Sequence, residues 1–99
     1  MRIAVTGRSA LVIVDVQVDF MPGGALPVPG GDEVIPYVNK LISMFSEARR
    51  PIIATRDWHP PNHCSFSPRG PWPPHCIRGT RGAEFAHGLE LPRDVLVVS

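Results

Sequence analysis

Lysine, cysteine and long apolar runs are scarce in this 99-residue chain, and each scarcity narrows what the protein can do. Lys40 is the only lysine and the net charge is +1, so the chain lacks the clustered cations that bind nucleic acid or anionic lipid. The longest apolar runs, Ala10–Val14 and Val95–Val98, are far too short to cross a bilayer. Arg8 interrupts any apolar signal core, and we therefore predict a cytoplasmic protein without membrane or nucleic-acid partners.

The composition is otherwise that of a globular chain. Hydrophobic residues make up 43% and charged residues 19%, which argues against disorder, and the length allows one domain or part of one. The two cysteines, Cys64 and Cys76, could form at most one disulfide. In a chain with no export signal we expect both to be reduced thiols.

Three apolar segments and one amphipathic segment predict a parallel α/β sheet. Leu11–Val16 is a nearly continuous β-branched run, which favours a strand buried on both faces. Ile52–Thr55 and Val95–Val98 predict two further strands. A helix is expected between the first two strands, from Asp32 as its N-cap to about Arg49, because a proline follows there. Its apolar face combines residues at three- and four-residue spacing, namely Val34, Ile35, Val38, Leu41, Ile42 and Phe45.

A single helix cannot cover both faces of such a sheet. We therefore infer that the chain is a fragment or needs a partner chain. The alternative is that the Pro-rich loop, which runs from the second strand to about Pro92, folds back as a lid. Uncovered apolar faces would also favour a homo-oligomer.

Three of the four histidines lie with an aspartate in this Pro-rich loop: Asp57, His59, His63 and His75. One carboxylate and three imidazoles suit a single divalent ion, Zn or else Fe or Mn. Asp57 and His59 are two residues apart, so in an extended segment their side chains face the same way, and His63 returns after a Pro-Pro turn. The alternative is that exposed loop histidines bind nothing. The fourth histidine, His87, fits no pattern and is expected at the surface.

Asp15 interrupts the first apolar run near its carboxyl end, where open α/β sheets bind ligands. A carboxylate in a buried strand is costly unless it is paired or functional. The alternative is a structural aspartate satisfied by nearby backbone N–H groups.

The order and spacing of these residues resemble the nicotinamidase/pyrazinamidase branch of the isochorismatase-like cysteine hydrolases. The matching segments are Asp15–Phe20, Gly23-Gly24, Pro29–Asp32, Thr55–His63, Trp72–Cys76 and Gly79-Thr80. The resemblance covers about Ala10 to Ser99, and the three-histidine box is specific because metal-free relatives lack it. It implies an α/β fold with a three-layer, Rossmann-like parallel sheet. Residues 1–99 would form the N-terminal part of one such domain, with about three strands, one main helix and a long metal-binding loop.

The resemblance also implies residue roles. Asp57, His59, His63 and His75 match the metal ligands. Asp15 matches the catalytic acid that takes the proton of a cysteine thiol. Phe20 and Trp72 match rings that line a pyridine pocket, with ordinary core packing as the alternative. Gln17 matches a substrate-binding position near the active site, with a structural hydrogen-bonding role as the alternative.

The activity that the resemblance implies is hydrolysis of nicotinamide, or a related aromatic amide, to nicotinate and ammonia by an Asp-Lys-Cys triad. No residue of this chain matches the lysine or the cysteine. Cys64 and Cys76 directly follow proposed ligands and should point away from a metal. We therefore expect the chain alone to be inactive while keeping its metal site. It would be either a nicotinamidase portion completed by a C-terminal chain or a non-catalytic metal-binding remnant. A mononucleotide-binding βαβ protein is disfavoured because no phosphate-binding Gly-rich loop follows the first strand.

Overall fold

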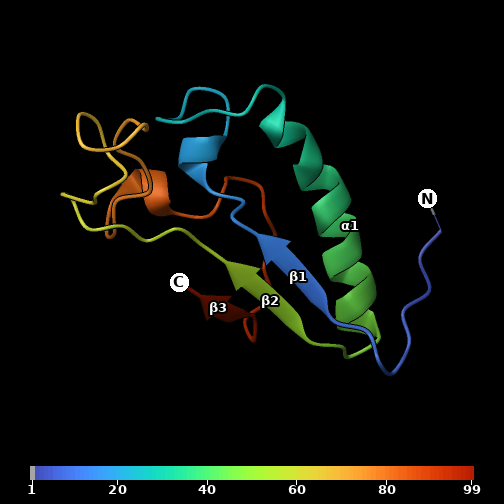
Figure 1. Ribbon diagram of the computed structural model, residues 1–99. Coiled ribbons are helices and arrows are strands. Elements are labelled where there is room, and N and C mark those ends of the chain that lie inside the picture. Colours follow the sequence, from blue (N-terminus) through green and yellow to red (C-terminus); the bar gives the residue numbers. More distant parts are fainter. Residues whose placement is uncertain (1) are drawn as a thin grey trace.

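The sheet is small, parallel and ordered β1-β2-β3, as the computed structural model of residues 2–99 shows (Figure 1). β1 spans Leu11–Val14, β2 spans Ile52–Thr55 and β3 spans Leu96–Val98. The main helix, α1, spans Val34–Glu47 and connects β1 to β2. The predicted α/β class, three strands and one main helix are confirmed, and the strand boundaries differ from the predicted ones by at most two residues.

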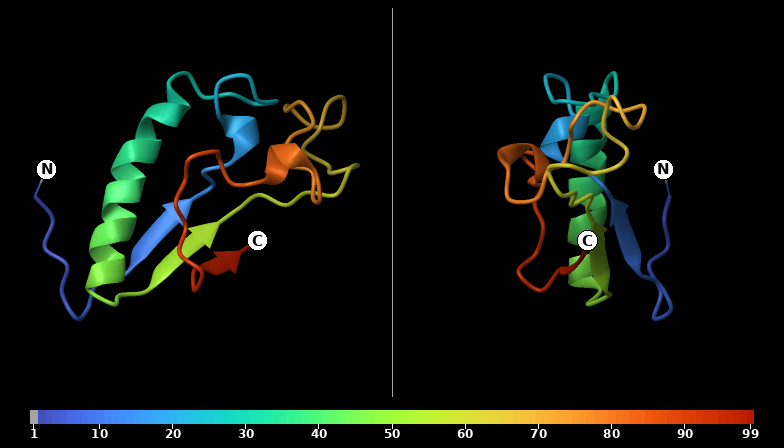
Figure 2. Two further views of the ribbon diagram at one scale, coloured as in Figure 1. Left: turned by 180° about the vertical axis from the view of Figure 1, so that it is seen from behind. Right: turned by 60° about the vertical axis from the view of Figure 1, so that its left-hand side comes forward.

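α1 covers only one face of the sheet (Figure 2). Ile42 and Phe45 of the helix share the buried core with residues on that face of the strands, Ile13, Ile52 and Ala54. Successive side chains along a strand point to opposite faces of the sheet, so the core-facing residues are two positions apart. This packing fixes the register of the strands and places their carboxyl ends at one common edge.

The other face of the sheet is apolar and exposed. The strand register aligns Val12 with Leu96 through β2, and Val14 with Val98 in the same way. Val14 is 65% exposed and Leu96 is 61% exposed. The prediction that the first strand is buried on both faces is therefore wrong, because α1 is the only α-helix that residues 2–99 provide to cover the sheet. The Pro-rich loop does not form a lid over this face: it first extends beyond the carboxyl ends of the strands, and its last part returns with Ala86, Leu89 and Leu91 packed against the same core as α1 (Figure 1).

The start of α1 differs from the predicted one. Asp32 is not the N-cap; it lies in a short 3-10 turn, η2, which spans Gly31–Glu33 and runs directly into the helix. Gly30 opens this turn at φ +68°, and the Glu33 N–H donates to the Gly30 carbonyl at 3.0 Å. Backbone bonds of this kind take over the role of a side-chain cap.

The end of α1 is a Schellman motif at Arg49, which adopts φ +55°. The Arg50 N–H donates to the Phe45 carbonyl and the Arg49 N–H donates to the Ser46 carbonyl. The helix therefore ends close to the predicted position, through a left-handed residue ahead of the proline. Among residues 2–99, no helix combines the length and apolar character that a membrane span requires.

Candidate metal centre

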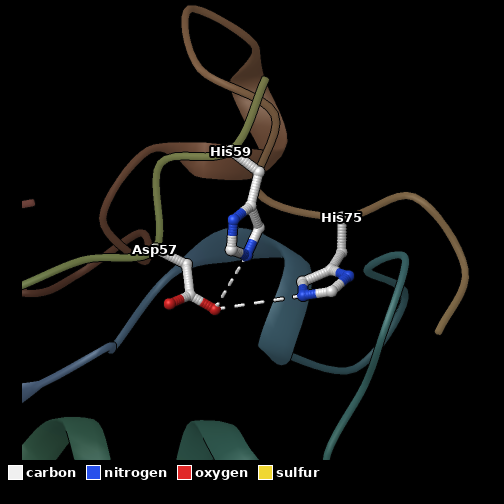
Figure 3. Close-up of side chains that lie close together, drawn as sticks. All are labelled: Asp57, His59 and His75. Carbon is white, nitrogen blue, oxygen red and sulfur yellow. Dashed lines mark ion pairs between the residues drawn. The ribbon is translucent and has the colours of Figure 1, made fainter. Parts of the chain in front are cut away.

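Asp57, His59 and His75 converge beyond the carboxyl ends of β1 and β2 (Figure 3). The Asp57 Oδ2 atom lies 3.4 Å from Nε2 of His59 and 3.9 Å from Nε2 of His75. One donor atom from each of the three residues lies within 4.8 Å of the others. Three of the four predicted ligands are thus assembled by the fold.

Backbone pairing brings His75 to the other two residues. The His59 N–H donates to the Cys76 carbonyl at 2.9 Å, and the Arg78 N–H donates to the His59 carbonyl at 2.8 Å. These two bonds form a parallel bridge between His59 and Ile77. The loop therefore closes on itself at the point where the ligands are needed.

The tautomer of His75 follows from its neighbour. Its Nδ1 atom lies 2.8 Å from the Pro73 carbonyl oxygen, which can only accept a hydrogen bond. Nδ1 therefore carries the proton, and the lone pair is on Nε2, the atom that faces Asp57. A hydrogen bond of this kind orients a ligand imidazole in known metal sites.

The donor set fits a divalent ion. Bonds of about 2.1 Å in a tetrahedral arrangement place neighbouring donors about 3.4 Å apart. The observed distances between Asp57 Oδ2 and the two Nε2 atoms, 3.4 and 3.9 Å, are close to that spacing. One carboxylate oxygen and two imidazole nitrogens suit Zn, Fe or Mn and leave coordination positions open.

His63 lies beside this group rather than in it. Its ring stacks on His59 with the centroids 4.2 Å apart. Its Nδ1 atom lies 2.7 Å from Oγ of Ser65 and accepts the Ser65 N–H at 3.2 Å. Its role as a fourth ligand stays a prediction.

Phe66 is a residue that the sequence did not single out. It is buried, and its ring centroid lies 5.7 Å from His59, 5.6 Å from His63 and 5.4 Å from His75. The three imidazoles thus pack around one phenyl ring. No periodic pattern could have revealed this contact, because the Pro-rich loop has no repeating geometry.

Asp15 lies at the same sheet edge in a left-handed conformation, φ +54°. Such a conformation costs a non-glycine residue about 1–3 kcal/mol and often marks functional sites. Oδ1 of Asp15 accepts a 2.7 Å hydrogen bond from the Thr55 hydroxyl, a partner that the sequence did not indicate. The carboxylate is thus held by a side chain rather than by backbone N–H groups. The catalytic role of Asp15 stays a prediction.

Gln17 is completely buried, and its side-chain amide holds the backbone of Asp57 through hydrogen bonds. Its Nε2 donates to the carbonyls of Asp57 and Ala83, each at 2.9 Å, and its Oε1 accepts the Asp57 N–H at 2.8 Å. These contacts favour the structural alternative considered for Gln17.

The two aromatic residues predicted to line a pocket differ in exposure. Phe20 is half-buried and its ring lies 5.8 Å from His75. Trp72 is 48% exposed, so core packing does not explain its position.

The two cysteines differ sharply in environment. Cys76 is fully buried, and burial, together with the nearby charges of Asp19, Asp57 and Asp15, raises the pKa of its thiol to about 12. Cys64 is exposed, and both cysteines are free.

We expect iodoacetamide at about pH 8.5 to label only Cys64 in the folded chain, because the reaction requires both a thiolate and solvent access. Mass spectrometry should show one adduct on the folded chain and two after denaturation; two adducts on the folded chain would contradict this.

A parallel sheet whose strands end at a carboxylate–imidazole cluster places the chain among the α/β proteins with a candidate metal centre at the carboxyl edge of the sheet. Residues 9–99 match the isochorismatase domain, and the chain belongs to this family. The predicted family and its isochorismatase-like fold are confirmed.

Similar proteins include nicotinamidases and pyrazinamidases. The nicotinamidase of Acinetobacter baylyi is 39% identical, over 99% of this chain and 52% of its own length. The structure of Pyrococcus horikoshii pyrazinamidase in complex with zinc is 58% identical with a TM-score of 0.85, over 89% of this chain and 49% of that one. That of L. infantum PnC1 in complex with nicotinate is 41% identical with a TM-score of 0.83, over 99% and 50%. The chain thus spans about half the length of these relatives.

Proposed function

We propose that this chain is the metal-binding part of a nicotinamidase-type amidohydrolase that acts on nicotinamide or a related aromatic amide. The observation that carries the proposal is the convergence of Asp57, His59 and His75 at the sheet edge that also holds Asp15. The relatives described above in complex with zinc and with nicotinate support it.

Each residue has a distinct task in this proposal. Asp57, His59 and His75 would hold a divalent ion, with His63 as a further ligand. Such an ion would supply a Lewis acid for an aromatic nitrogen of the substrate. Phe20 and the exposed ring of Trp72 offer flat surfaces for an aromatic substrate.

Asp15 is the proton acceptor in this proposal. Thr55 binds its Oδ1 atom, so Oδ2 is the atom that takes the proton of a thiol. Neither Cys64 nor Cys76 suits that thiol, since Cys64 is exposed in the Pro-rich loop and Cys76 is buried with a pKa raised to about 12, which opposes loss of its proton. Lys40 is exposed on α1 and is not the lysine of a triad. The proposal therefore requires a second polypeptide segment that supplies lysine and cysteine.

The second candidate is a non-catalytic metal-binding protein. The same cluster favours it, because the nearby thiol, that of Cys76, is buried and its pKa is raised to about 12, which makes it a poor nucleophile. The two candidates differ in what happens when the rest of the catalytic machinery is supplied.

A chimera separates them. We expect this chain, joined to the remaining half of the P. horikoshii pyrazinamidase, to release ammonia from nicotinamide, and Asp15→Asn to lower kcat by about 100- to 10,000-fold because the proton acceptor is lost. Asp32→Asn, which changes an exposed carboxylate, is the matched control and should have no effect. The 99-residue chain alone should release no ammonia above background.

Two results would contradict these expectations. A folded, zinc-loaded chimera without activity would favour the non-catalytic candidate. Turnover by the 99-residue chain alone, abolished by Asp15→Asn, would overturn the need for a second segment.

A further inference from the structure

We propose that Asp19 is a positioning residue for the metal centre, which fixes the backbone that carries His75 without being a ligand itself. This inference rests on the metal centre of the proposed function. Asp19 lies in η1, a 3-10 turn that spans Val18–Phe20 and directly follows Gln17. It is not among the residues whose donor atoms converge, which are Asp57, His59 and His75.

One oxygen of the Asp19 carboxylate holds the residue after His75. Oδ2 accepts the N–H of Cys76 at 2.8 Å. Cys76 adopts φ +47°, a left-handed conformation that residues with a side chain rarely adopt. A charged acceptor on its N–H stabilises that conformation. The Cys76 carbonyl accepts the His59 N–H, so Asp19 holds the backbone segment that brings His59 and His75 together.

The other oxygen holds a separate loop. Oδ1 accepts the N–H of Ala25 at 3.1 Å, and the carbonyl of Asp19 accepts the N–H of Leu26 at 2.9 Å. Both carboxylate oxygens thus bind backbone amides, from two segments far apart in the chain. Asp19 ties the position of the Cys76 turn to the loop that follows η1.

The lack of a side chain at Gly82 leaves room for the Asp19 carboxylate. A Cβ atom at Gly82 would overlap both carboxylate oxygens of Asp19, with Oδ1 only 2.5 Å away. Because the neighbouring atoms belong to a charged side chain held by two amides, relief requires the carboxylate to move. A methyl group at position 82 therefore displaces Asp19 without altering its chemistry, which offers a second, independent way to disturb the same contact.

Loss of this contact should weaken metal binding without removing a ligand. His75 keeps its Pro73 hydrogen bond, but the backbone that carries it is no longer fixed on the Cys76 side. Residues that orient ligands typically contribute about 10- to 100-fold to metal affinity. The geometry around the ion should change as well, which a merely structural residue would not cause.

The test is a Zn²⁺ titration of the 99-residue chain by competition with a chromophoric chelator. Asp19→Asn keeps the size of the side chain but removes one acceptor, and Gly82→Ala displaces the carboxylate. We expect each to weaken Zn²⁺ binding by about 10- to 100-fold and to alter the d–d absorption of the Co²⁺-loaded chain. Thr80→Val is the matched control, since it removes a 2.6 Å bond to the Ile77 carbonyl in the same loop, and both readouts should stay unchanged.

The outcomes are distinguishable. A wild-type chain that binds no Zn²⁺ would overturn the metal centre and this inference together. If the wild type binds Zn²⁺ and the two variants match its affinity and Co²⁺ spectrum, this inference alone is overturned. Circular dichroism of the metal-free variants checks that they fold. If Asp19→Asn does not fold, the result for Gly82→Ala decides the test. Unfolding of both would also overturn the inference, because Asp19 would then support the fold rather than the ligand.

Discussion

Replacing Asp57 by alanine is expected to weaken Zn²⁺ binding by about 100-fold or more. Oδ2 of Asp57 is the atom that both Nε2 atoms face, at 3.4 and 3.9 Å. Structural zinc sites with four ligands bind with roughly 10–16 kcal/mol, or about 3 kcal/mol per ligand. Since 1.4 kcal/mol is tenfold, the affinity should fall by about 100-fold or more. Metal analysis of the purified chain and a chelator-competition titration measure the loss.

The matched control is Asp94→Ala, which removes an exposed carboxylate ahead of β3, at the opposite edge of the sheet. This variant should bind Zn²⁺ as the wild type does. About one equivalent of tightly bound Zn²⁺ in the Asp57 variant would contradict the assignment. His63→Ala, measured beside them, decides whether the fourth histidine turns toward the ion. A loss as large as that of the Asp57 variant would make it a ligand, and an unchanged affinity would leave a centre of three residues.

Replacing Gln17 by leucine is expected to unfold most of the chain. The side chain is completely buried, and its loss leaves three backbone groups without partners: the Asp57 N–H, the Asp57 carbonyl and the Ala83 carbonyl. Each group left unsatisfied costs about 1–3 kcal/mol, with the partly buried N–H and carbonyl of Asp57 at the lower end of that range. The sum approaches the whole stability of a domain of this size, about 5–15 kcal/mol. Urea denaturation followed by tryptophan fluorescence measures the change.

Asn39→Leu is the control for that experiment. The Asn39 amide also makes two bonds to backbone, to the Gly88 carbonyl and from the Glu90 N–H, each 2.8 Å long. These bonds are exposed, so water can replace the lost partner, and the cost should be about 1 kcal/mol. Equal destabilisation by the two substitutions would show that burial of Gln17 is not the cause.

The sequence was sufficient for the elements and for the ligand-bearing loop. The apolar runs at Leu11–Val14 and Ile52–Thr55 have few other structures open to them, and the clustering of Asp57, His59 and His75 is visible without any fold. The convergence of His75 on the other two also depends on the backbone bridge between His59 and Ile77, which the sequence does not show.

The supporting contacts were beyond sequence reasoning. Phe66 meets the histidines only once the irregular Pro-rich loop has folded, and no periodicity describes such a segment. Thr55 meets Asp15 through the register of β1 and β2, which residue type alone does not fix. The sequence favours Asp32 as the N-cap because a helix pattern does not show the left-handed turn at Gly30. The sequence does not predict the exposure of β1, because residue type reports what a strand prefers, whereas exposure depends on which other layers are present.

The long connection between β2 and β3 has a consequence for how the chain folds. β3 pairs with β2 only after the connection at residues 56–95 has been gathered into place, and the cost of closing such a loop grows with its length. Parallel pairing over so large a separation is slow. An ion held by Asp57 and His75 would tie two points of that connection together and shorten the part left free. Metal binding would thus speed the pairing of β3 with β2, in addition to any role of the ion in catalysis.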